Sequence, residues 1–100
     1  MNIISISWGA PEIFFSPSIL RVFNNTFQIA TNRGITVCVA SGDVGSSDGT
    51  RSLTVDFPSC CPYAMACGGT TLTSSEETAW SYNKQYKWGG GGGVSYYFKN

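Results

Sequence analysis

The residues that could do chemistry gather where a predicted strand ends. Residues 35–40 (Ile-Thr-Val-Cys-Val-Ala) are β-branched, apolar or small, which predicts a buried strand. Ser41, Gly42 and Asp43 follow at once, and α/β proteins bind ligands at the carboxyl ends of parallel strands. Gly42 would let a ligand approach the backbone, and Asp43 would stand at the mouth of a cleft rather than on an open surface. From these three residues alone, a turn-capping Asp43 is the simpler alternative.

Two more stretches place polar groups beside predicted structure. Residues 3–8 alternate isoleucine with small residues and predict a second buried strand, with Ser7, Trp8 and Gly9 at its end. Such a strand end can pair with an extended peptide through main-chain hydrogen bonds, although Trp8 could equally pack in a core. Asp56 lies in Val-Asp-Phe-Pro, where it could face the same pocket or satisfy backbone groups of its own turn.

One helix is predicted between these two strands. Ser16 and Pro17 are typical of a helix start, and Gly34 suits the position just after a helix end. One apolar face is predicted by residues that recur at spacings of three and four: Leu20, Phe23, Phe27 and Ala30. Strand, helix and strand then form a right-handed βαβ unit. A short buried strand at 64–67 extends the parallel sheet.

The remaining stretches predict loops. Residues 44–52 are rich in glycine and serine, and Asp48 within them is expected to be a turn residue. This loop lacks the lysine-containing phosphate-binding motif, which argues against nucleotide binding. Residues 76–87 begin with Glu76 and Glu77, end with Lys84 and Lys87, and predict a polar hairpin or loop edge. The glycine run 89–93 has the composition of a linker, but the Val-Ser that follows it favours close backbone packing.

Taken together, the motifs resemble the sedolisin family, the serine-carboxyl peptidases. The resemblance is carried, in order, by residues 4–12, 39–49, 55–58, 62–63, 66–72 and 90–95. It implies an α/β fold with a subtilisin-like parallel sheet flanked by helices. Residues 1–100 would then be the central part of a peptidase catalytic domain, and so a partial domain.

The resemblance also implies roles for individual residues. Asp43 matches the aspartate that stabilises the oxyanion formed when a nucleophile attacks the scissile carbonyl. An ionised carboxylate cannot donate a hydrogen bond, so Asp43 would act when burial and an acidic medium keep it protonated. The residues implied in substrate binding are Ser7, Trp8, Gly9, Ser41, Gly42 and Asp56.

Other parts of the family's machinery do not match this sequence. Neither Gly49-Thr50 nor Gly69-Thr70 is followed by the serine of the family's Gly-Thr-Ser nucleophile motif. The family's catalytic Glu and Asp would lie upstream, and Glu12 does not match them. The 100 residues alone are therefore expected to be inactive, within either a serine-type endopeptidase or a tripeptidyl peptidase. The alternative is a degenerate, non-catalytic peptidase fragment that binds peptides or has no function.

Composition narrows the classes of partner. Six basic and six acidic residues give no net charge and no basic patch, so a nucleic-acid partner is not expected. No apolar run approaches the roughly 20 residues that span a bilayer, so no membrane partner is expected either. The expected partner is a peptide or protein substrate. The resemblance implies an extracellular or lysosomal, acidic location, and no signal peptide is expected in this stretch.

Metal and cysteine chemistry is also limited. The sequence contains no histidine, which excludes a Ser-His-Asp triad and a histidine-containing zinc site within these residues. No cofactor or metal site is expected here, and the resemblance places the family's calcium site downstream of residue 100. The four cysteines form no C-x-x-C pair and are expected to be thiols, with a disulfide from Cys60 or Cys61 to a residue elsewhere as the alternative.

Overall fold

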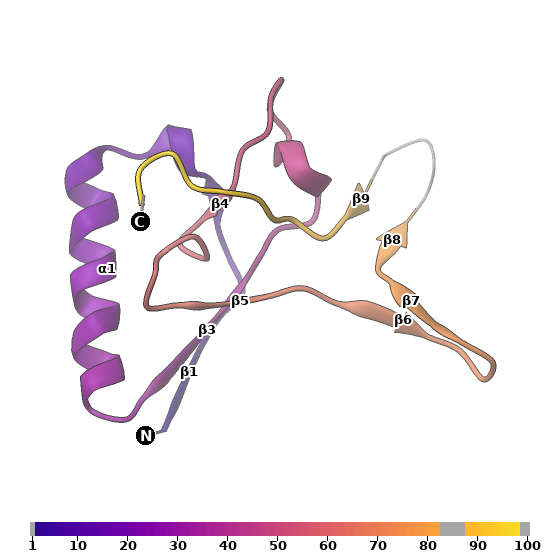
Figure 1. Cartoon of the computed structure of the whole chain (residues 1–100), viewed down its shortest axis with the longest axis horizontal. Coiled ribbons are helices and arrows are strands. Elements are labelled where there is room, and N and C mark those ends of the chain that lie inside the picture. The colour runs from indigo at the N-terminus through magenta and orange to yellow at the C-terminus, as the bar shows by residue number, and fades with distance from the viewer. Residues whose placement is uncertain (1, 83–87, 99–100) are drawn as a thin grey trace.

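A three-stranded parallel sheet organises the molecule. The computed structural model describes residues 2–82 and 88–98. Strands β1 (Ile3–Ile6), β3 (Thr36–Ala40) and β5 (Met65–Cys67) pair in the order β1-β3-β5 (Figure 1). Ile6 lies opposite Val39, and Ala40 lies opposite Cys67. Because all three strands are parallel, the loops that follow them leave from one edge of the sheet, as the sequence predicts.

Helix α1 (Pro17–Asn32) connects β1 to β3 and covers one face of the sheet (Figure 1). Ser16 caps it by accepting the Ile19 N–H at 3.4 Å, and Pro17 occupies the first turn. Gly34 follows the helix end with a φ of +78°, a conformation that favours glycine. The predicted helix start and end are both confirmed.

The core lies between α1, β3 and the turn after β4 (Asp56–Phe57). Its buried members are Leu20, Phe27, Ala30, Val37, Val39, Phe57 and Cys61. The Phe57 ring is fully buried, 4.6 Å from the ring centroid of Phe15 and 5.0 Å from that of Phe23. The apolar face predicted for the helix is therefore the face that builds the core.

The outer strands differ from the prediction of buried strands. Ile3 on β1 is 64% exposed and Met65 on β5 is 53% exposed. The first strand also ends at Ile6, two residues earlier than predicted, and Trp8 beyond it is exposed rather than packed in a core. The reason is that α1 covers only one face of the sheet, and no described element covers the other.

Short elements complete the chain. The antiparallel pairs are β2 (Ala10–Pro11) with β4, β6 (Thr70–Leu72) with β7 (Glu77–Ala79), and β8 (Ser81–Tyr82) with β9 (Trp88–Gly89). Two 3-10 helices are η1 (Glu12–Phe14) and η2 (Gly45–Ser47). The polar hairpin or loop edge predicted from residue 76 to 87 begins in β7 and β8, and its part at 83–87 lies outside the described residues. Within residues 2–82 and 88–98, no helix is long and apolar enough to cross a membrane.

Candidate active site

The ends of β1 and β3 bring two of the predicted stretches to one cavity. Ser7, Trp8 and Gly9 follow β1, while Gly42 and Asp43 follow β3, and the two strands are paired neighbours. The cavity between them measures about 370 Å³. It is lined by Ser7, Trp8, Gly9, Ala10, Pro11, Ala40, Gly42, Asp43, Val44, Asp48 and Asp56. Six of the seven predicted site residues therefore meet in one place.

Asp56 is held between the glycines of the two stretches. A Cβ on Gly9 would collide with the Asp56 carboxyl and would lie 2.7 Å from the Phe57 carbonyl oxygen. A Cβ on Gly42 would lie 3.2 Å from Asp56 Oδ2. Gly42 also has a φ of +106°, which other residues rarely adopt. Both glycines are needed because the buried carboxyl occupies the space that a side chain would fill.

The electrostatic environment of Asp56 favours its protonated form. Burial, followed by the negative charge of Asp48, raises the pKa of Asp56 to about 7. The backbone N–H groups of Phe57 and Ala10 oppose part of this increase. Burial also raises the pKa of Asp48 above its ordinary value. The lining residues include no Lys, Arg or His to counter these carboxyls.

Asp43 lines the cavity, but the residue is exposed. The expectation that Asp43 is buried is therefore wrong for the part of the chain that the structure describes. The Asp43 backbone is fixed nevertheless: its carbonyl accepts the Gly89 N–H at 2.8 Å, and Val44 forms a bridge with Gly89.

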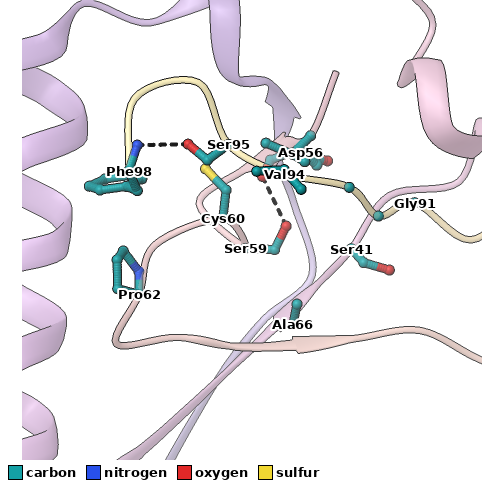
Figure 2. A pocket seen from close by; sticks show the side chains of 13 residues that line it. Ser41, Asp56, Ser59, Cys60, Pro62, Ala66, Gly91, Val94, Ser95 and Phe98 are labelled. Atoms are coloured by element: carbon teal, nitrogen blue, oxygen red, sulfur yellow. Dashed lines mark hydrogen bonds between the residues drawn. The ribbon is translucent and has the colours of Figure 1, made fainter. Parts of the chain in front are cut away.

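Ser41 is the predicted site residue that lies outside this cavity. Its side chain is buried, and its hydroxyl has no partner among the described groups. It lines a neighbouring cavity of about 470 Å³ beneath the glycine run, together with Asp56, Ser59 and Cys60 (Figure 2). Ser41 also lines a smaller cavity of about 250 Å³, which it shares with Gly42 and Asp43.

The glycine run packs directly on the backbone of this loop. A Cβ on Gly91 would collide with the Ser41 carbonyl oxygen, and one on Gly93 would lie 3.2 Å from Val55 Cγ1. These contacts confirm the prediction that the run marks close backbone packing. Together with the Gly89 hydrogen bond to Asp43, they place the run alongside residues 41–43.

Glu12 was not predicted to have a role at the site, yet it is a buried carboxylate, 3% exposed. Its Oε1 accepts hydrogen bonds from the Ser95 hydroxyl and, at 3.7 Å, from the Cys60 thiol. Its Oε2 accepts the Tyr96 N–H at 3.2 Å. The contact spans more than 80 residues, so local sequence patterns carry no signal for it. Glu12 fastens the segment that follows the glycine run.

No two of the four cysteines, all of which the structure describes, are bonded to each other. Burial, followed by the Glu12 charge, raises the pKa of Cys61 to about 12. The same two causes, in the same order, raise the pKa of Cys60. These two thiols therefore stay protonated and unreactive at the pH of any cellular compartment.

Asp48 is the second residue whose contribution the sequence did not reveal. It is a turn residue as expected, with a φ of +52° at the end of η2. It is also 6% exposed, and it lines the same cavity as Asp56. The Asp-Gly dipeptide signals the turn, but nothing in it indicates that the carboxyl points inward.

Comparison with known proteins places this geometry in context. The model of the subtilase family matches residues 1–92. Kumamolisin from Bacillus sp. (strain MN-32) is 43% identical over 97% of this chain, which covers 19% of kumamolisin. Tripeptidyl-peptidase sed4 of Aspergillus fumigatus is 36% identical over 97% of the chain, which covers 16% of that protein. The chain thus spans less than a fifth of these relatives.

A solved structure is similar over the whole chain. Pseudomonas sedolisin, a serine-carboxyl proteinase complexed with two molecules of pseudo-iodotyrostatin, matches with a TM-score of 0.85. The two are 30% identical, and the match covers 99% of this chain and 32% of the sedolisin chain. The similarity extends to both the fold and the sequence.

Proposed function

The chain belongs to the subtilase family and, within it, to the sedolisins, and from this we propose that it supplies part of the substrate-binding site of an acid-acting serine-carboxyl peptidase. The observation that carries the proposal is the single cavity shared by the ends of β1 and β3. Two strand ends that meet at a cavity can hold an extended peptide on one side and act on its carbonyl on the other.

In this proposal, each wall of the cavity has a separate task. The main chain of Ser7, Trp8 and Gly9 pairs with the backbone of a peptide or protein substrate. Protonated Asp43 donates a hydrogen bond to the oxygen that becomes negative when the scissile carbonyl is attacked. Because the Asp43 carboxyl is exposed, an acidic medium has to supply its proton. Asp56 faces the substrate side chain that precedes the cut.

The remaining machinery comes from residues outside this chain. The nucleophile and the catalytic Glu and Asp of the family have no counterpart among these 100 residues. The family's calcium site is likewise assigned elsewhere. Within the described residues, no three His, Cys, Asp or Glu side chains are grouped so as to hold a metal ion. We place the protein in an acidic compartment, extracellular or lysosomal, where Asp43 can hold its proton.

Replacing Asp43 tests the proposal. In the protein as its gene encodes it, Asp43→Ala should lower kcat for a peptide substrate at acid pH by roughly a hundredfold or more, because one oxyanion donor is lost. Asp43→Asn should retain more activity, since an amide donates at every pH. In the parent, kcat should decline with rising pH as Asp43 loses its proton, and in Asp43→Asn this part of the decline should be absent. Steady-state kinetics across the acid range measure both effects.

The control is Glu76→Gln, which removes an exposed carboxyl in the β6–β7 turn and should leave kcat unchanged. An Asp43→Ala enzyme with the parental kcat would show that Asp43 is a turn residue without a catalytic role.

A further inference from the structure

Two buried carboxyls approach the same point beside Gly42. Asp48 is 6% exposed and Asp56 is 7% exposed. A Cβ on Gly42 would lie 2.9 Å from Asp48 Oδ1 and 3.2 Å from Asp56 Oδ2, so these two oxygens lie within about 6 Å of each other. One water molecule can bridge two carboxyl oxygens near the upper end of this range, and oxygens about 3 Å apart can share a proton directly.

One oxygen of each of these carboxyls has no hydrogen-bond partner in the described part of the chain. Among the described groups, Asp48 Oδ2 and Asp56 Oδ1 are buried and accept no hydrogen bond. Two ionised carboxylates in this position would be buried and close, each with one oxygen that accepts no hydrogen bond from a described group, which is a costly arrangement in a protein interior. Neighbouring carboxyls resolve the conflict by keeping a proton between them. The raised pKa of Asp56 agrees with this geometry.

The two carboxyls belong to different parts of the site. Asp48 ends η2, in the loop that begins with Gly42 and Asp43, and its N–H donates to the Gly45 carbonyl. Asp56 lies on β4, whose backbone pairs with β2 directly after Gly9. A link between the two carboxyls therefore connects the loop that carries Asp43 to the β2–β4 pair, which follows Gly9.

The charged groups that face this pair are few. From the same loop, Asp43 adds a third negative charge, which raises the pKa of Asp56 slightly. From β2, the facing residues are Ala10 and Pro11, which do not titrate. Glu12 directs its carboxylate to Ser95 and Tyr96 instead. The lining residues include no basic side chain that could replace the proton.

We propose that Asp48 is a positioning residue that shares one proton with Asp56 and thereby holds the Asp43 loop in place in acid. This proposal deepens the proposed function: the shared proton matters for catalysis only if Asp43 acts as the oxyanion donor. In acid, the bridging proton stabilises the loop. When rising pH removes this proton, two buried negative charges repel each other and the loop moves away from β4.

The test is a carboxyl titration followed by ¹³C NMR in the protein as its gene encodes it. In the parent, the Asp56 carboxyl should titrate far above the ordinary aspartate value. In Asp48→Asn, its midpoint should fall by about one pH unit or more, because the neighbouring charge is gone. The amide signals of Gly42 and Asp43 should follow the Asp56 midpoint in the parent and lose that transition in the variant.

Two comparisons keep the result interpretable. Glu76→Gln should leave the Asp56 midpoint unchanged. Asp56→Asn should lower the Asp48 midpoint in turn, so the pair is tested even if Asp48→Asn fails to fold. A folded Asp48→Asn protein with the parental Asp56 midpoint would overturn the proposal. This readout does not depend on turnover, so its failure is distinct from a failure of the Asp43 kinetics.

Discussion

At the scale of single residues, the site depends on positions without side chains. Gly9 and Gly42 enclose the Asp56 carboxyl, and Gly42 also admits Asp48. These two glycines come from stretches more than 30 residues apart in the sequence. The sequence shows that both positions are glycine, but only the fold shows that one carboxyl accounts for both.

Gly42→Ala should destabilise the protein more than a glycine substitution in open space. Gly34 provides the matched control: its φ of +78° is also positive, but a Cβ there would meet nothing within 4 Å. Gly34→Ala should cost about 1 kcal/mol of unfolding free energy from backbone strain alone. Gly42→Ala should cost about 2–4 kcal/mol, because its methyl group also displaces two buried carboxyls.

Urea unfolding of both variants at acid pH measures the difference. Equal costs at the two positions would mean that the carboxyls near Gly42 move aside freely, which would contradict their tight placement.

At the scale of elements, the sequence predicts what is local. The helix over Pro17–Asn32 follows from its cap, its apolar spacing and the glycine after its end, all within one stretch of chain. The strands at 36–40 and 65–67 follow from runs of apolar and small residues. The exposure of these strands could not be predicted, because it depends on what covers the far face of the sheet. The apolar composition of β1 and β5 therefore predicted burial, whereas both strands are exposed on that face.

The candidate site likewise contains residues that local sequence predicts and residues that only the fold reveals. The sequence patterns and the resemblance indicated the residues of the cavity, because each lies beside a strand end. Asp48 and Glu12 could not be found in this way: the Asp48 carboxyl faces Asp56 on another element, and Glu12 contacts Ser95, which is 83 residues away in the sequence. Ser41 was expected beside Gly42 in one wall, and the two residues do line one small cavity with Asp43, although Ser41 lies outside the larger cavity between the ends of β1 and β3.

The glycine run offers a prediction at this scale. Gly91→Ala places a methyl group against the Ser41 carbonyl oxygen, whereas a Cβ on Gly90 would meet nothing within 4 Å. Gly91→Ala should therefore cost about 1–3 kcal/mol of stability, and Gly90→Ala much less. Hydrogen exchange at the Gly89 amide, which donates to Asp43, should accelerate in Gly91→Ala only. Unchanged exchange in both variants would mean that the run does not brace the Asp43 loop.

At the scale of the whole molecule, the chain is somewhat extended. Its radius of gyration is 14.4 Å, against about 13 Å for a typical compact domain of 100 residues. The open face of the sheet presents Ile3 and Met65 to solvent. The chain also covers only 19% of kumamolisin. Under the proposed function these residues supply binding walls and an oxyanion donor, and the family's nucleophile motif is not among them.

The 100 residues by themselves should therefore not cleave peptides. Mass spectrometry of peptide mixtures incubated with the purified chain at acid pH measures this, with the protein as its gene encodes it as the positive control. Peptide binding without cleavage would support the alternative of a non-catalytic, peptide-binding segment. Cleavage that disappears in Asp43→Ala would show that the chain carries its own nucleophile.

The enclosure of Asp56 by Gly9 and Gly42 also limits which residues can replace Asp56 in the course of evolution. Codons for asparagine, alanine and glycine are each a single base change from an aspartate codon, and all three side chains fit the space that the glycines leave. Glutamate is as close in the genetic code, but its extra methylene would press against both walls. In a saturation library at position 56, folded survivors should be enriched in small or isosteric residues, so new specificities would arise through a larger pocket rather than a relocated charge.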